Sequence, residues 1–436
     1  MKEQKYMNPL LTKTRIIGLI IAIIIHIVFI WGYIQIYEYS TALIYGFSIF
    51  FPIFMIYIYS KLFFSLFYRA KKDNKEIKKQ IMNASVSLVV PFYNEKKELM
   101  EKQVESILKQ TKPFDQVYFV DDGSVDKETT EFLSMVCDKI PSFHLHVCEE
   151  NKGKREAQGK VLNLIDSDFI MTTDSDTFFK EDCLYELLIP FFENKRKKDV
   201  VAVTGKVVGI NENKNLLTSI LNMRYYNAFE SERGSQSATQ SVIVASGPCT
   251  VYRADIIQDN LHEYLNQIFL GKKQTFGDDR CLTNISLKYG DVLFQNTAVA
   301  MTFMPENMKS FMKQQIRWNR SFFRESLLGV IALTKLGRIK PLLWIIMEVL
   351  LFALMLTTLS LALYSMFFQD GYFAIEFFSF TLFIIVNSIA RNIYYFRITP
   401  KAIFLAPIYG FIHLLIIMPI KVYALFTLKD IRWITR

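Results

Sequence analysis

The stretch that decides the fold is QVYFVDDGS at residues 116–124, in which an apolar run leads directly into two carboxylates and a glycine. A short apolar run that ends at turn residues is typical of a buried strand. Similar runs occupy residues 85–90 (SVSLVV), 144–148 and 169–173, with charged segments of helical character between them. Strands that alternate with helices predict an α/β domain with a parallel sheet. Such sheets bind ligands beyond the carboxyl ends of their strands.

Acidic residues follow the expected strands at this edge. They form three clusters, which are Asp121 with Asp122, Asp174 with Asp176, and Asp278 with Asp279. An Asp-x-Asp turn after a buried strand can hold a hard divalent cation, which in turn neutralises a diphosphate leaving group. Aspartate before Gly or Ser is also common turn chemistry. The repetition of the pattern favours group transfer over turn chemistry alone.

Basic and aromatic residues add two further candidates. NKGKR at residues 151–155 could supply phosphate-binding cations at a helix start, or could be a solvated charge run. Residues 306–330 place aromatic and basic side chains at helical spacing, as expected of a helix in the membrane interface. On this helix Arg317 could pair with a diphosphate. Trp318 could stack on a sugar or anchor the helix at the membrane surface.

Composition argues against a purely soluble protein. Hydrophobic residues make up 51% of the 436 residues, and the excess lies in the first and last stretches. The net charge of +9 comes largely from basic residues beside the apolar runs, where anionic headgroups explain it better than nucleic acid does. The five cysteines lie in the middle of the chain without metal-ligand spacing, which indicates reduced thiols in a cytosolic domain.

Two apolar runs near the N-terminus predict a membrane hairpin. Residues 16–36 and 42–60 are each long enough to cross a hydrocarbon layer of about 30 Å. Basic residues precede the first run and follow the second, whereas the connector at 31–41 has none. The positive-inside rule therefore places the N-terminus and the domain after residue 70 in the cytoplasm. No small-x-small cleavage site follows the first run, which argues against a signal peptide.

The C-terminal apolar region is less simple. Residues 342–368 and 372–396 predict a third and a fourth span. Residues 403–428 are too few to cross twice, and one crossing would put the basic tail outside, so a broken, re-entrant or interfacial segment is favoured. The predicted units are 1–70 (membrane hairpin), 84–305 (catalytic domain), 306–335 (interface helix), 338–428 (membrane region) and 429–436 (cytosolic tail).

Together the motifs resemble those of processive family-2 glycosyltransferases, the group that contains cellulose, chitin and hyaluronan synthases. They stand here as PFYNE (91–95), DDGS (121–124), DSD (174–176), GDD (277–279) and QQIRW (314–318). Within the group the chain is most similar to bacterial, streptococcal-type hyaluronan synthases. This similarity is carried by NKGKR (151–155), RYYNAF (224–229), SGP (246–248), GDDRCLTN (277–284) and QQIRWNRSFFRE (314–325). It runs from the second apolar run to the end of the chain.

The resemblance implies a GT-A-like (Rossmann-like) cytosolic α/β domain combined with α-helical transmembrane and interfacial helices. It also implies an inverting transfer with Asp279 as general base and Asp278 in support. The donor site implied by the resemblance comprises Tyr93, Glu95 and Asp121 or Asp122 for the uridine, Lys154 for the phosphates, and Asp174 with Asp176 for Mg²⁺ or Mn²⁺.

The resemblance also implies an acceptor site. Ser246, Gly247 and Pro248 would receive the growing sugar end, and Trp318 of the motif that begins at Gln314 would form the acceptor platform. In the same motif Arg317 would steady the diphosphate, and Trp433 with Arg436 would belong to a gating tail. Ile434 stands where the tail motif has glycine. A branched residue cannot adopt positive φ at low cost, so the tail departs from the pattern.

The implied activity is alternate transfer of GlcNAc and GlcA from UDP-GlcNAc and UDP-GlcA to a growing hyaluronan chain, which leaves through the protein's own membrane segment. The enzyme would be a multi-pass protein of the plasma membrane, in contact with membrane lipids, with a cytoplasmic catalytic domain. Neither nucleic acid nor an obligate protein partner is expected. His26, Asn387 and His413 could line the channel, or could hydrogen-bond between helices.

Three alternatives stay open from the sequence. A chitin or other homopolymer synthase would use UDP-GlcNAc alone. A transferase that glycosylates a lipid phosphate has no need for the Gln-x-x-Arg-Trp motif. A transporter or membrane scaffold with a degenerate transferase domain would have lost the carboxylates Asp174, Asp176 and Asp279, which are present here.

Overall fold

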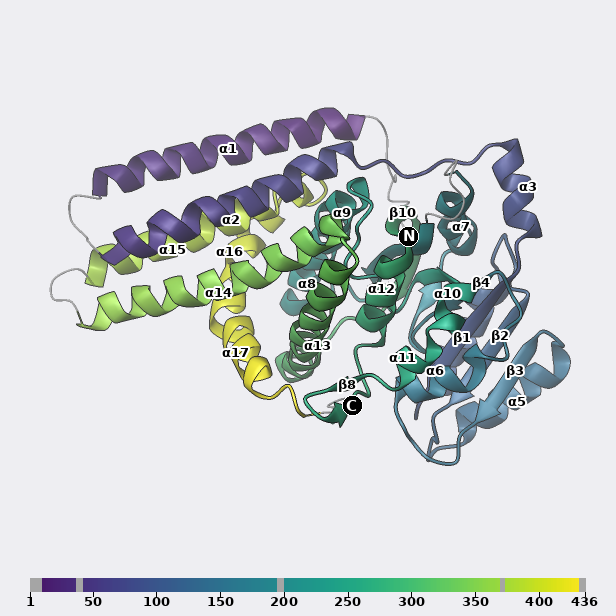
Figure 1. The fold of residues 1–436 in the computed structure, drawn as a ribbon. Coiled ribbons are helices and arrows are strands. Elements are labelled where there is room, and N and C mark those ends of the chain that lie inside the picture. Colours follow the sequence, from purple (N-terminus) through teal and green to yellow (C-terminus); the bar gives the residue numbers. More distant parts are fainter. Residues whose placement is uncertain (1–9, 37–41, 194–199, 369–372, 431–436) are drawn as a thin grey trace.

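The computed structural model describes residues 10–36, 42–193, 200–368 and 373–430. A mixed α/β domain occupies one end of the molecule, and long apolar helices extend from it (Figure 1). The predicted tail residues Trp433 and Arg436 lie outside the described residues.

The α/β domain is built on one sheet whose strand order is β3-β2-β1-β4-β7-β6-β10-β5. Its strands are β1 (Val86–Phe92), β2 (Gln116–Asp121), β3 (Phe143–Val147), β4 (Phe169–Thr172), β5 (Phe178–Phe179), β6 (Val200–Gly209), β7 (Thr250–Arg253) and β10 (Asp291–Thr302). The predicted α/β class is confirmed. The sheet is mixed rather than wholly parallel, because β7 runs antiparallel to β4 and β6, and β5 runs antiparallel to β10.

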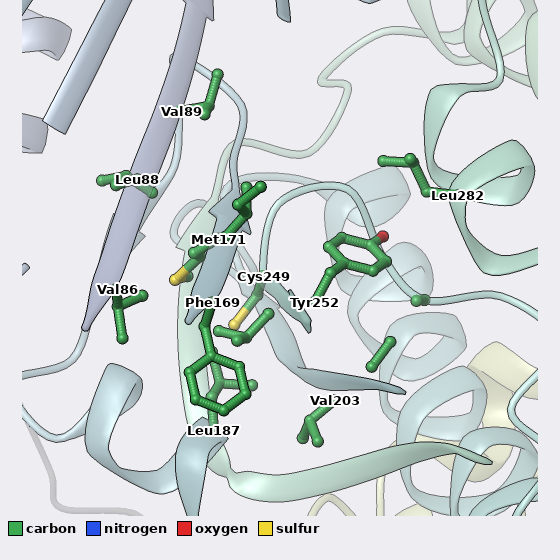
Figure 2. Close-up of a cluster of buried hydrophobic side chains, with 14 of the residues drawn as sticks. Val86, Leu88, Val89, Phe169, Met171, Leu187, Val203, Cys249, Tyr252 and Leu282 are labelled. Carbon is green, nitrogen blue, oxygen red and sulfur yellow. The ribbon is translucent and has the colours of Figure 1, made fainter. Parts of the chain in front are cut away.

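The parallel half of the sheet has the sequence pattern of strands buried on both faces. Every residue of β1 and β4 is buried, because helices cover the sheet on each side. Figure 2 shows part of the resulting core, where Leu88 and Met171 of neighbouring strands lie near Leu187, Cys249 and Tyr252. This continuous core fixes the strand ends and therefore the loops that carry the acidic residues.

Short helices connect the strands. They are α3 (Lys75–Asn83), α4 (Lys97–Leu108), α5 (Glu128–Lys139), α6 (Lys154–Leu162), α7 (Cys183–Glu193), α8 (Leu216–Tyr226), π-helical η2 (Asn227–Arg233), α9 (Gly234–Ala238), α10 (Ala254–Asp259), α11 (Leu261–Leu265) and α12 (Asp278–Tyr289). A small hairpin of β8 (Ile268–Phe269) and β9 (Lys272–Lys273) projects just before α12. The segment between β7 and β10 thus carries both an exposed hairpin and the predicted base.

The apolar helices are α1 (Leu10–Ile36), α2 (Ala42–Phe67), α14 (Ile339–Phe368) and α15 (Phe373–Arg391), together with a broken C-terminal stretch of α16 (Ala402–Ile412), η4 (His413–Ile417) and α17 (Met418–Phe426). The short η3 (Tyr395–Arg397) follows α15. Among the residues that the structure describes, three stretches are long and apolar enough to cross a membrane, which are Lys13–Trp31, Ile339–Leu361 and Ala402–Phe426. The apolar stretches within α2 (Pro52–Phe67) and α15 (Phe377–Arg391) are shorter than these three.

The C-terminal stretch takes a different direction from the other apolar helices. In Figure 1, α1, α2, α14 and α15 run away from the domain together, whereas the yellow α16–α17 stretch runs across them. The helix α13 (Met308–Lys335) also runs across this direction and packs against α14 and α17. The division into units at 70, 84, 306, 338 and 429 stays a prediction.

Of the three polar residues that could line a channel, His26 and Asn387 hydrogen-bond to each other. His26 Nε2 lies 3.2 Å from Asn387 Oδ1, and His26 Nδ1 lies 2.7 Å from the Tyr59 hydroxyl. These bonds join α1, α2 and α15, so they support helix–helix hydrogen bonding at His26 and Asn387. His413 is different, because its Nδ1 is buried without a hydrogen-bond partner among the described residues.

Candidate active site

The loop after β1 carries the first predicted donor residues. Tyr93 is 43% exposed, whereas Glu95 is buried and its Oε2 accepts a hydrogen bond of 2.7 Å from Ser175 Oγ. Ser175 lies between the two predicted metal ligands, so Glu95 supports their turn from the neighbouring strand. The structure therefore leaves the Tyr93 ring available for a ligand and ties Glu95 to the Asp174–Asp176 turn.

Asp121 and Asp122 shape the loops around the donor site. Asp121 is fully buried and accepts hydrogen bonds of 2.7 Å from both the Ser124 amide and the Thr130 hydroxyl. The Asp122 carboxylate accepts from the amides of Lys152 and Gly153 at 3.0 and 2.8 Å. Burial raises the pKa of Asp122, and those amide hydrogen bonds oppose the shift.

Gly123 allows the two loops to meet. It has φ +74°, a region that favours glycine, and a Cβ built there would lie 2.6 Å from the Glu150 carbonyl carbon. The loop that precedes Lys154 therefore packs directly on the backbone of the acidic turn. This close approach places the start of α6 beside the carboxyl ends of β1 and β4.

Lys154 joins two of the three acidic clusters. Its Nζ bonds Asp174 Oδ1 and lies 2.9 Å from Asp278 Oδ2. Burial disfavours the charged form of Lys154, but the two carboxylates outweigh it and raise the pKa of the ammonium. The residues of β4, α6 and α12 thus converge at one place, as the sequence predicts for a catalytic centre.

The neighbouring aspartates of α12 have opposite surroundings. Burial works against the charged form of Asp278, yet the Lys154 ammonium lowers its pKa. At Asp279, burial and the Asp278 charge raise the pKa, although Arg280 and Lys154 oppose the shift. A raised carboxyl pKa suits proton acceptance near neutral pH better than a lowered one. Of the pair, Asp279 has the surroundings of a general base.

The loop at residues 246–248 faces the carboxylates. A Cβ built on Gly247 would lie 3.5 Å from Lys154 Nζ, 3.7 Å from Asp279 Cβ and 4.0 Å from Asp174 Oδ2. Ser246 and Pro248 hold the loop on the sheet, since the Ser246 amide donates to Thr204 at 2.9 Å and the Pro248 carbonyl accepts from Thr173 at 2.9 Å. Gly247 therefore leaves room for about a methyl-sized group between the predicted base and the predicted metal turn.

Asp174 and Asp176 are chemically suited to a divalent cation. Both are half-buried on one turn after β4, and Asp176 Oδ1 accepts from the Thr302 hydroxyl at 3.3 Å. Across the residues that the structure describes, no three His, Cys, Asp or Glu side chains are grouped so as to hold a metal. Mg²⁺ is usually bound by one or two carboxylates and substrate phosphates. Two hard oxygen donors beside an open space fit that mode.

The predicted residues of α13 lie near this centre. Arg280, which follows Asp279, lies over the Phe322 ring at 5.3 Å. Trp318 is 43% exposed and lies about one helical turn before Phe322. Arg317 and Gln314 are half-buried on the preceding turn. The structure thus packs α13, which carries the exposed Trp318, against α12.

Two buried arginines hold the base segment, and one of them, Arg155, belongs to the candidate phosphate-binding run at 151–155. Arg155 Nη2 lies 3.4 Å from the Phe276 carbonyl, and Arg324 Nη2 donates to the same oxygen. Both side chains are 1% exposed. Both arginines lie within the resembling motifs at 151–155 and 314–325, which was the available signal that they matter. The sequence did not reveal their shared partner, because Phe276 is far from Arg155 and Arg324 along the chain.

Comparisons with known proteins agree with this geometry. A family model described as glycosyl transferase family 2 matches residues 87–261. Hyaluronan synthases of Streptococcus pyogenes, such as that of serotype M6, are 36% identical over 432 residues, which cover 98% of each chain. The chain belongs to the hyaluronan synthase group of glycosyltransferase family 2. This family-2 glycosyltransferase is accordingly an enzyme.

Two further relatives of this glycosyltransferase are informative. An N-acetylglucosaminyltransferase of Azorhizobium caulinodans is 33% identical over 364 residues, which cover 80% of this chain and 87% of that protein. A solved mannosyltransferase of Pyrobaculum calidifontis, in complex with GDP-Man and Mn²⁺, has a TM-score of 0.60 and 15% identity, and covers 85% of this chain and 97% of its own. This likeness confirms the GT-A-like fold.

Proposed function

We propose that this glycosyltransferase synthesises hyaluronan by adding GlcNAc and GlcA alternately from UDP-GlcNAc and UDP-GlcA. The observation that carries the proposal is the convergence of Lys154, Asp174, Asp278 and Asp279 around the open space at Gly247. The choice of these two donors rests on the identity to the streptococcal hyaluronan synthases along nearly the whole chain.

The donor would lie across the carboxyl ends of β1, β2 and β4. Tyr93 would stack on the uracil, and Glu95 with the Asp121–Asp122 turn would shape the uridine pocket. Because Asp121 and Asp122 are engaged with Ser124, Thr130 and backbone amides, we assign them to pocket building more than to direct ligand contact.

The diphosphate would lie between Lys154 and the Asp174–Asp176 turn. Asp174 and Asp176 would hold Mg²⁺ or Mn²⁺, which when bound neutralises charge on the leaving UDP. The Lys154 ammonium, now shared by Asp174 and Asp278, can donate a charge-assisted hydrogen bond to a phosphate oxygen.

Asp279 would activate the acceptor. Its carboxylate removes the proton of the acceptor hydroxyl while that oxygen attacks the anomeric carbon and the bond from this carbon to UDP breaks. One base on the face opposite the leaving group gives inversion. Ser246, Gly247 and Pro248 would receive the growing end, Trp318 would provide a stacking platform, and Gln314 and Arg317 would border the acceptor and the diphosphate.

The polymer would leave through the helices that adjoin this site. Stretches long and apolar enough to cross a membrane support a membrane location for the chain. We further propose several spans, a plasma-membrane location and a cytoplasmic catalytic domain, on the basis of the basic residues that flank the first two apolar runs. The polymer and lipids would be its partners, together with the two donors.

The test is synthesis by the purified enzyme in lipid nanodiscs with both donors and Mg²⁺ or Mn²⁺. We expect a high-molecular-weight product that hyaluronidase digests, and none with Asp279→Asn. A product that resists hyaluronidase would refute the assignment of the polymer. Undiminished synthesis by Asp279→Asn would refute the assignment of the base.

A second candidate is a homopolymer synthase that uses UDP-GlcNAc alone. The similarity to an N-acetylglucosaminyltransferase along 80% of the chain favours it over other transfers. Radiolabelled UDP-GlcNAc supplied without UDP-GlcA separates the two functions. Hyaluronan synthesis predicts no long polymer under this condition, whereas a homopolymer synthase would extend one.

A further inference from the structure

The β8–β9 hairpin presents apolar side chains to the exterior. Ile268 is 67% and Leu270 55% exposed, while Phe269 between them is buried. Ile268 pairs with Lys273 across the hairpin, and Phe269 pairs with Lys272. The exposed tip therefore combines two aliphatic side chains with two exposed lysines.

The turn of this hairpin has an unusual residue for its conformation. Leu270 has φ +50° and Gly271 has φ +77°, so both central residues are in the left-handed region, as in a type I′ turn. Asparagine or aspartate is preferred at the first of these positions, and another residue there costs about 1 kcal/mol. A leucine at this place adds strain and exposes apolar surface, which points to a contact outside the domain.

The base of the hairpin rests on the interface helix. Gln267 Nε2 donates to Glu325 Oε2 at 3.1 Å, and Gln274 Oε1 accepts from Arg324 Nη1 at 2.6 Å. The end of α17 reaches the same helix one turn earlier, where Arg320 Nη2 lies 3.1 Å from Asp430 Oδ2. Figure 1 shows β8 beside the end of α17. The hairpin is thus near the membrane end of the domain.

The charge of this tip fits an anionic lipid surface. No acidic residue occurs between Glu263 and Asp278, and both Lys272 and Lys273 are exposed, although Lys273 also pairs with Glu156 at 2.6 Å. At the end of α17, Phe426 is likewise exposed, at 82%. Aliphatic side chains flanked by lysines are the composition of an interfacial membrane contact.

We propose that the β8–β9 hairpin dips its tip into the headgroup region of the membrane, with Leu270 and Ile268 among the lipids and Lys272 and Lys273 on anionic headgroups. Five residues after Lys273 the chain reaches Asp278 and the start of α12, and Arg155 and Arg324 clamp the intervening carbonyl of Phe276. The contact would therefore fix the catalytic segment relative to the membrane surface. It does not depend on which polymer the enzyme makes.

The test measures lipid contact directly in the full chain. Ile268→Cys, labelled with an environment-sensitive fluorophore, is placed in nanodiscs that contain nitroxide-labelled lipids, with or without phosphatidylglycerol. The matched control is Leu164→Cys, an exposed leucine in the loop that leads to the amino end of the central strand β4. The signal of the unsubstituted chain, labelled in parallel, is subtracted to account for the native cysteines.

We expect at least twofold stronger quenching at residue 268 than at residue 164. Phosphatidylglycerol should increase the quenching at residue 268 further, and the double variant Lys272→Gln, Lys273→Gln should abolish this increase. Leu270→Asn, which suits the type I′ turn, should keep the thermal midpoint and reduce quenching at residue 268. Equal quenching at residues 268 and 164 would overturn the proposal. The proposal would also be overturned if Leu270→Asn left the protein folded and the quenching at residue 268 unchanged.

Discussion

Asp278 and Asp279 are adjacent at the start of one helix, but only Asp278 bonds Lys154. This difference has a consequence for the pH dependence of the enzyme. A base must be ionised to act, so kcat/KM should fall as pH decreases through the pKa of Asp279, which burial and the Asp278 charge raise. Asp278→Asn removes that like charge and should lower the pKa. The acid limb of the kcat/KM profile should therefore move to lower pH, whatever the height of the plateau.

The pH profile of a conservative change elsewhere provides the control for this shift. Glu105→Gln alters an exposed pair with Lys109 on α4 and should leave the acid limb in place. If Asp278→Asn leaves the acid limb of the kcat/KM profile in place, the group that titrates in this limb is not influenced by the Asp278 carboxylate.

A substitution at Gly247 can separate an effect on catalysis from an effect on folding. Its φ is not in the left-handed region, and an added Cβ would meet Lys154 and Asp279 only at ordinary contact distances of 3.5 and 3.7 Å. Gly247→Ala should fold normally, yet its methyl group would occupy the space proposed for the acceptor. Displacement of reacting groups by about 1 Å can cost roughly 100-fold in rate. We expect a loss of this order in kcat with an unchanged thermal midpoint.

Gly123→Ala is the contrasting variant. It forces a Cβ to 2.6 Å from the Glu150 carbonyl carbon at φ +74°, so it should lower the thermal midpoint as well as the rate. Equal midpoints for the two glycine variants would contradict this assignment of strain. Loss of folding in Gly247→Ala would contradict the open space at that site.

At the residue level, the sequence predicted the convergence of Lys154, Asp174 and Asp279 because each lies at a strand end or a helix start. The arginine clamps could not be predicted in this way. The sequence predicted a phosphate-binding or solvated charge at Arg155 and a basic residue of the interface helix at Arg324. Their burial depends on the path of the chain at Phe276, which no local pattern reports.

At the level of elements, the π-helical segment η2 joins the catalytic domain to the apolar helices. Glu230 in η2 lies 3.0 Å from Arg15 of α1 and 2.9 Å from Lys206 of β6, and all three side chains are at most 7% exposed. Asn296 of β10 donates to the same carboxylate at 3.3 Å. One buried carboxylate thereby neutralises cations from a membrane helix and from the sheet.

Removal of this charge should separate the two parts of the molecule. Glu230→Gln leaves Arg15 and Lys206 buried beside an amide, and breaking a buried ion pair typically costs about 3–5 kcal/mol. We expect a clear fall in the thermal midpoint of the detergent-solubilised enzyme. Glu105→Gln, which alters an exposed pair, should not change the midpoint measurably. A stable Glu230→Gln would show that this carboxylate is not needed to hold α1 on the catalytic domain.

The elements also show where sequence patterns lose information. The apolar runs at 85–90, 116–120 and 169–173 are long enough to reveal buried strands. The strands β5 and β7 have two and four residues, too few to show a period, and they introduce the antiparallel pairs of the sheet. Helix η2 (Asn227–Arg233) begins within the resembling motif at 224–229, but its ion pairs join residues up to 215 positions apart.

For the whole molecule, the unresolved question from the sequence was the path of residues 403–428. Composition alone permits one crossing, since Ala402–Phe426 is long and apolar enough. The described contacts add a constraint that composition lacks. Asp430, just beyond α17, lies 3.1 Å from Arg320, and Thr427 Oγ1 accepts from the same guanidinium at 3.1 Å.

From these contacts we expect the end of α17 to lie on the same side of the membrane as the catalytic domain. Arg320 belongs to α13, whose later turns contact the loop before Asp278, so α13 cannot be on the far side. The stretch also runs across α1, α2, α14 and α15 in Figure 1. We therefore expect this stretch to enter the membrane and return within one leaflet rather than to cross it once.

We therefore expect the C-terminus to be cytoplasmic. In oriented membrane vesicles, a cysteine appended after Arg436 should react with a membrane-impermeant maleimide only from the cytoplasmic side, as should Leu164→Cys in the catalytic domain. Arg320→Gln removes the bonds to Thr427 and Asp430 and leaves the apolar stretch unchanged, so the sidedness should persist while the thermal midpoint falls. Labelling of the appended cysteine from the outer side would mean that Ala402–Phe426 crosses the membrane, and that the Arg320–Asp430 pair does not form in the bilayer.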